Sequence, residues 1–109
     1  MSQFNDRERA FETKFAHDED MKFRIIARRN RLLGEWAASK MGLSAEETQS
    51  YAKDVVRADF EEAGDEDVVR KVLGDLTSAN VDIDEAQIRE ALGHKEVEAR
   101  RQIIEATNL

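Results

Sequence analysis

The chain has 109 residues, no cysteine, no proline and a net charge of −7, which fits one small domain. The lack of cysteine excludes disulfide bridges and thiolate chemistry, and an acidic chain is a poor general binder of nucleic acid. No apolar run reaches the length of a membrane-spanning helix, so we expect a cytoplasmic protein without direct membrane contact.

The first predicted element is the segment at the N-terminus. Phe4, Phe11 and Phe15 are spaced seven and four residues apart, so on a helix they would share one stripe. A stand-alone helix of this length is marginal in water, and exposed phenylalanine is unfavourable. We therefore expect residues 1–17 to be a flexible segment that folds on a partner. The alternatives are a fifth helix packed on the domain and a tail without a role.

The rest of the chain predicts an all-α domain. Helical periodicity is strong over residues 18–109, and the absence of proline removes the strongest helix breaker. Four helices with short connections predict a small antiparallel four-helix bundle. The first of them is expected to begin near Asp18 or Glu19 and to end at Met41, with Gly42 as a left-handed cap.

The remaining three helices have recognisable starts. Ser44 with Glu47 has the pattern of a capping box, and the second helix is expected to end at Gly64. Asp65 is expected to cap the third helix, and Asp84 with a glutamine three residues on opens the fourth. A bend or fray is expected at Gly93. The apolar side chains expected to form the core are Met21, Ile25, Ile26, Leu32, Leu33, Trp36, Tyr51, Ala52, Val55, Val56, Phe60, Val68, Val69, Val72, Leu73, Leu76, Ile88, Leu92, Ala99 and Ile103.

A basic island lies in the first helix of the domain. Residues 21–43 carry six basic side chains and one acidic one, although the chain as a whole is acidic. Arg24, Arg28 and Arg31 are spaced four and three residues apart and would line one stripe, with Arg29 beside it. One interpretation is a solvated face neutralised by acidic neighbours. The other is a docking surface for acidic protein or for the phosphates of a nucleotide, since arginine makes bidentate contacts with both.

Signals for catalysis are weak throughout the sequence. Neither His17 nor His94 has a second histidine three or four residues away, which argues against a zinc site. The five glycines are scattered and form no phosphate-binding loop. Adjacent carboxylates such as Glu61 and Glu62 are typical of a solvated helical face. We expect no catalytic residue and no metal ligand.

Three stretches within residues 4–38 carry a family resemblance: FNDRE at the start, KFAHD in the middle and ARRNRLLGEWAA after it. They resemble the zeta subunit of alphaproteobacterial F-type ATP synthases, a family of small inhibitors of ATP hydrolysis. Residues 39–109 match this family in pattern more than in motif.

The resemblance implies a mechanism. In the family, a mobile N-terminal segment becomes helical as it enters a catalytic subunit interface near the rotor shaft, and it blocks rotation while the helical domain acts as an anchor. The implied partner is the catalytic head of the ATP synthase, made of alternating catalytic and non-catalytic subunits around the shaft. The protein would be a monomer when free, peripheral to the inner membrane through the synthase, and would require no cofactor. The inhibitory contacts carried over are Phe4, Asn5, Asp6, Arg7, Glu8, Arg9, Phe11, Glu12, Lys14 and Phe15.

An alternative function is a small nucleotide sensor or adaptor. Arg24, Arg28, Arg29 and Arg31, with Trp36 nearby in sequence, would then hold ADP or ATP as a regulatory ligand. This function is compatible with inhibition. An enzyme is the third reading, and no residue spacing supports it.

Overall fold

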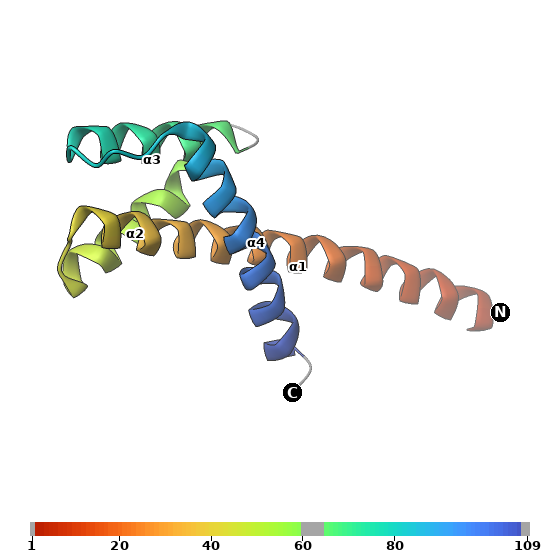
Figure 1. The fold of residues 1–109 in the computed structure, drawn as a ribbon. Helices are drawn as coiled ribbons and strands as arrows, with labels where there is room; N and C mark the ends of the chain where they lie inside the picture. Colours follow the sequence, from red (N-terminus) through yellow and green to blue (C-terminus); the bar gives the residue numbers. More distant parts are fainter. Residues whose placement is uncertain (1, 60–64, 108–109) are drawn as a thin grey trace.

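The structure is a computed structural model that describes the backbone of residues 2–59 and 65–107 and the side chains of residues 19–59 and 65–106. Within that range it contains four helices and no strand, which confirms the predicted all-α fold (Figure 1). In chain order the helices are α1 (Ser2–Met41), α2 (Ala45–Ala58), α3 (Glu66–Ser78) and α4 (Glu85–Thr107).

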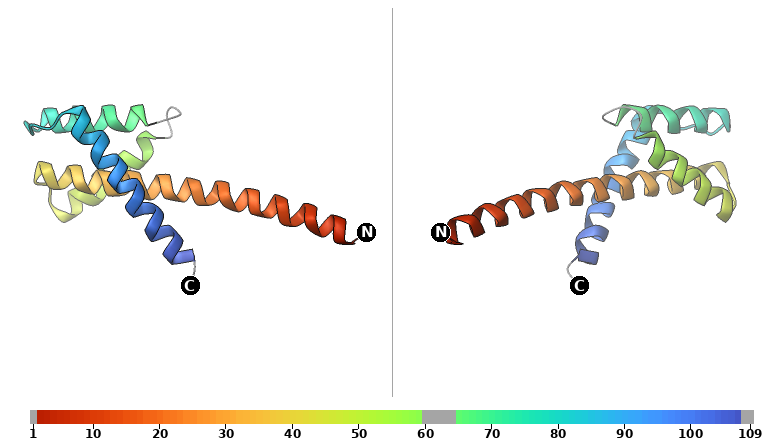
Figure 2. Two further views of the ribbon diagram at one scale, coloured as in Figure 1. Left: turned by 45° about the vertical axis from the view of Figure 1, so that its right-hand side comes forward. Right: turned by 180° about the vertical axis from the view of Figure 1, so that it is seen from behind.

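Helix α1 is the element on which the others are built. Both α2 and α4 pack mainly against its C-terminal half (Figures 1 and 2). Helix α3 packs against all three of the other helices. Helix α4 crosses α1, so the four helices do not share one common axis. The N-terminal half of α1 extends away from the other helices, and the molecule is 65 Å in its longest dimension.

Helix α1 begins at Ser2 and not near Asp18 or Glu19, where the sequence analysis placed the start of the first domain helix. Neither residue acts as a cap, because residues 2–17 are already helical before them. No glycine or proline interrupts the chain between residues 2 and 33, so nothing local stops the helix. Flexibility of residues 1–17 in the free protein stays a prediction.

Three of the predicted helix ends are confirmed in atomic detail. Gly42 has a φ of 72°, and the Leu43 amide donates to the Ala38 carbonyl at 3.0 Å, which closes α1. At the start of α2 the Glu47 amide donates to Ser44 Oγ (3.2 Å), and the Ser44 amide donates to Glu47 Oε1 (2.9 Å). Asp84 and Gln87 make the same reciprocal pair before α4, at 2.8 and 2.9 Å.

Three other expectations differ from the structure. Helix α2 ends at Ala58, before the predicted end at Gly64, which lies outside the described residues. Asp65 stands at the cap position of α3, but its side chain makes no capping hydrogen bond because it contacts Arg29 instead. Helix α4 is continuous through Gly93, so no fray occurs there, and the expected bend stays a prediction.

The core lies between the C-terminal half of α1 and the other three helices. Its fully buried apolar side chains include Leu33, Val55, Val72, Leu76 and Ile88. Eleven of the predicted core residues are buried and Phe60 lies outside the described residues. The others are only half-buried: Met21, Ile26, Leu32, Trp36, Tyr51, Val56, Leu73 and Ile103. Among the described side chains, every buried residue lies at or after Ile25, so the packed domain begins there.

Close packing of α1 on α2 depends on Gly34. A Cβ atom at Gly34 would lie 2.8 Å from the Ala52 Cα, which is backbone and cannot move aside alone. We expect Gly34→Ala to lower the free energy of unfolding by about 1–2 kcal/mol, because overpacking outweighs the better helix propensity of alanine. Urea unfolding measures this change. Gly74 is the matched control, since a Cβ there meets nothing within 4 Å and Gly74→Ala should be neutral or stabilising. Equal effects at both sites would refute the close approach.

Candidate functional site

The four arginines predicted in the basic island separate into two groups. Arg29 is 3% exposed, whereas Arg24, Arg28 and Arg31 lie on the surface. Arg24 pairs with Asp20 at 3.1 Å on the same helix. Exposed ion pairs of this kind contribute little to stability.

Arg28 and Arg31 occupy different surroundings on the exposed side of α1. Arg31 lies 3.5 Å from Glu35 and donates to Gln49 Oε1 on α2 at 2.8 Å. Arg28 is exposed and has no ion pair within the described part of the chain. Arg28 is therefore the arginine of this group most available to an external anion.

Arg29 joins three parts of the fold. Its Nη1 lies 3.2 Å from Glu96 Oε1 on α4, and its Nη2 lies 2.9 Å from Asp65 Oδ1 at the start of α3. The contact with Asp65 is an ion pair without the alignment of a good hydrogen bond. Its Nε donates to the side chain of Asn30, which is fully buried, at 3.1 Å. Arg29 is therefore occupied inside the protein and is not available as an exposed contact for a nucleotide.

Trp36 lies on the side of α1 that faces the core. It is half-buried and packs against the core cluster, and Lys40 Nζ lies 5.9 Å from the centre of its ring. The structure therefore gives Trp36 a packing role at the edge of the core.

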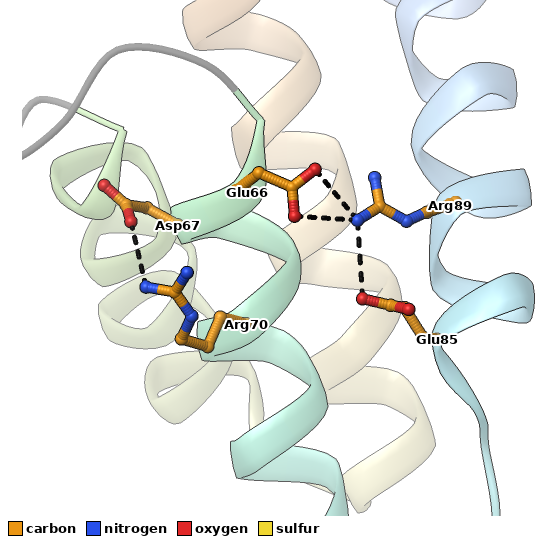
Figure 3. A network of polar contacts seen from close by, with 5 residues as sticks. All are labelled: Glu66, Asp67, Arg70, Glu85 and Arg89. Carbon is orange, nitrogen blue, oxygen red and sulfur yellow. Dashed lines mark hydrogen bonds and ion pairs between the residues drawn. The ribbon is translucent and has the colours of Figure 1, made fainter.

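Two polar links between helices were not predicted from the sequence. Arg89 Nη2 on α4 donates to both carboxylate oxygens of Glu66 at 3.0 and 2.8 Å, and it also contacts Glu85 at 3.3 Å (Figure 3). The Tyr51 hydroxyl donates to Asp75 Oδ2 at 2.8 Å, which joins α2 to α3. Burial and this hydrogen bond raise the pKa of Tyr51, so the phenol stays protonated and acts as a structural link.

The predicted inhibitory residues, from Phe4 to Phe15, all fall in the N-terminal part of α1. Their backbone is helical and continuous with the packed domain, and their side chains lie outside the described residues. Contacts of Phe4, Phe11 and Phe15 therefore stay predictions.

A groove between α1 and α4 is a feature that the sequence analysis missed. It measures about 340 Å³, and its apolar lining comes from Met21, Ile25 and Ile26 on α1 and Ile104 on α4. Met21 and Ile26 were expected in the core, but the crossing of α4 leaves them at the edge of this groove. No sequence signal could have shown which side chains of α1 and α4 meet.

A metal-binding cluster and a membrane-spanning helix are both absent from the described residues. No group of three or more histidine, aspartate or glutamate side chains in this part of the chain is placed to hold a metal ion. Within the same residues, none of the helices has the length and apolar character needed to cross a membrane. The fold is that of a small all-α protein with an open groove between α1 and α4.

The comparisons with known proteins agree with this class. The family model "ATPase inhibitor subunit zeta" matches residues 1–102, and the chain belongs to that family. A chain whose structure was determined in solution by NMR is 45% identical to this one and superimposes with a TM-score of 0.71. The similarity covers 79% of this chain and 98% of that chain. No match was found among curated proteins.

Proposed function

We propose that this protein inhibits ATP hydrolysis by the F-type ATP synthase. Its N-terminal segment, residues 1–17, would enter a catalytic subunit interface as a helix and block rotation. One observation carries the proposal: α1 runs from Ser2 to Met41 without a break and extends away from the packed domain (Figure 2). The family to which the chain belongs is described as an ATPase inhibitor subunit, which supports the proposal.

Continuity with the packed helix favours insertion of the segment. Starting a helix is the unfavourable step, whereas each further residue adds one hydrogen bond. The C-terminal half of α1 is held by α2 and α4, so it provides a nucleus from which residues 2–17 extend. These 16 residues reach roughly 24 Å at 1.5 Å per residue. That length is sufficient to enter an interface between two large subunits.

The energetics require an anchor beyond the segment itself. Burying Phe4, Phe11 and Phe15 would contribute about 5–9 kcal/mol. Ordering some 15 residues costs on the order of 15 kcal/mol when they start disordered, and less when the helix is already formed. Contacts of the helical domain with the partner must supply the difference. An isolated peptide of residues 1–17 should therefore inhibit more weakly than the whole chain.

Phe11→Ala tests the proposal directly. We expect this substitution to weaken inhibition of ATP hydrolysis by roughly 30-fold or more, since it removes about 2–3 kcal/mol of apolar contact with the partner. The melting temperature should stay unchanged, because the described core begins at Ile25. Inhibition curves with the purified catalytic head and a thermal melt provide the two readouts. A large fall in melting temperature would instead place Phe11 in the core of the free protein.

A regulatory nucleotide, ADP or ATP, is a second candidate ligand. Its support is Arg28, which is exposed and has no ion pair among the described residues, together with the weakly paired Arg24 and Arg31 beside it. Trp36 is half-buried and lies further along the same helix, so its fluorescence during titration with ADP or ATP measures binding. No change in fluorescence and no heat of binding by calorimetry would exclude this role.

A further inference from the structure

We infer that the groove between α1 and the C-terminal half of α4 is a second docking site, and that it binds an acidic amphipathic helix of the ATPase head. The inference rests on the proposed function and extends it, because it identifies the surface by which the helical domain is anchored.

The floor of the groove is apolar and open to solvent. Ile25 and Ile26 on α1 and Ile104 on α4 contribute to a groove of about 340 Å³. Ile104 is 42% exposed although isoleucine is usually buried. A helical partner that places apolar side chains three, four and seven residues apart would fill such a groove and cover this surface.

The charges around the groove are basic in an acidic protein. Lys22 on α1 and Arg100 on α4 line it, and neither has an ion pair within the described residues. The acidic side chain in the lining, Glu96, lies 3.2 Å from the buried Arg29, which it shares with Asp65. The two basic side chains and one acidic side chain of the lining sum to +1, whereas the chain as a whole carries −7. Complementary charge favours a partner helix with aspartate or glutamate beside its apolar stripe.

The position of the groove is consistent with an anchor for the segment. Its lining comes from residues 21–26 of α1 and residues 96–104 of α4, so it lies where α1 leaves the packed domain. The inhibitory segment, residues 1–17, ends one turn of helix before Met21. A subunit that contacts the segment is thus close enough to contact the groove as well, and both contacts would contribute to one affinity.

Charge reversal and apolar-to-charged substitution in the full chain test this site. We expect Arg100→Glu and Ile104→Asp each to raise the Kd for the purified catalytic head at least tenfold, as measured by biolayer interferometry. Matched controls lie on the same helix outside the groove: Arg101→Glu repeats the charge change, and Val97→Asp repeats the apolar change at a side chain that is 72% exposed. Both controls should stay within twofold of the wild type. All four side chains are exposed, and circular dichroism verifies that each variant is folded.

A photo-crosslinking residue in place of Ile104 identifies the occupant. Attachment to an acidic helical segment of a head subunit is the expected result. Unchanged Kd values for the groove variants, equal losses in the controls, or crosslinking to a second copy of this chain would each overturn the inference. A wild-type chain that neither binds the head nor inhibits hydrolysis would refute the proposed function and, with it, the partner named here. A chain that inhibits normally with a mutated groove would refute the groove alone.

Discussion

Removal of residues 1–17 should abolish inhibition of ATP hydrolysis while the helical domain stays folded. The proposed blocking element is lost entirely, so we expect inhibition to weaken by at least a hundredfold. The melting temperature should change little, because the buried side chains of the described part begin at Ile25 and the ion pairs there begin at Asp20. ATP hydrolysis by the purified head, titrated with the full chain and with the truncated chain, measures the effect.

Two further measurements make this experiment decisive. Backbone relaxation of the free full chain tests the predicted flexibility of residues 1–17 in solution. Binding of the truncated chain to the head, without inhibition, would support the separate anchoring role of the domain. Full inhibition by the truncated chain would contradict the blocking role of the segment, and the function would then have to be sought on the exposed arginines of α1.

Arg29→Ala should produce the largest loss of stability among single substitutions in the basic island, about 2–3 kcal/mol in the free energy of unfolding. The change leaves a cavity where a buried side chain stood and removes both ion pairs that hold α1 to Asp65 and Glu96. It also removes the donor to the side chain of the buried Asn30. The loss is smaller than for a fully buried ion pair, because the two carboxylates are about half exposed and can be hydrated.

Arg28→Ala is the matched control for this prediction. It removes the same side chain from the neighbouring position, where the arginine is exposed and has no ion pair in the described part of the chain. The free energy of unfolding should change by less than about 0.5 kcal/mol. Urea unfolding of both variants gives the comparison. If the two losses are equal, the contacts of Arg29 contribute no net stability.

Local signals in the sequence predicted the helices and most of their ends. The capping pairs Ser44–Glu47 and Asp84–Gln87 and the left-handed Gly42 act within a few residues of chain, so they can be recognised without the fold. The start of α1 was misplaced because Asp18 and Glu19 cap a helix only when the chain before them is not helical. Local sequence could not decide that point, since helix formation there depends on propagation from the packed half of α1.

The candidate site was predictable only in part. The sequence located the basic island and the phenylalanine stripe, and the family resemblance was confirmed by the family model over residues 1–102. It could not separate buried Arg29 from exposed Arg28, which are adjacent and of the same type. Only the angle at which α4 and the start of α3 approach α1 decides which of the two is enclosed.

The sequence by itself determined an all-α fold, the positions of most helix ends and the family, because these depend on periodicity, capping and motifs within short stretches of chain. Only the tertiary structure decided that Asp65 pairs with Arg29 instead of capping α3, and that Gly34 lets α1 and α2 pack closely. It also decided that residues of α1 and α4 together line an open groove with two basic side chains. The physical reason is that each of these features joins residues far apart in sequence. Their contacts depend on how the helices cross, which no single helix determines.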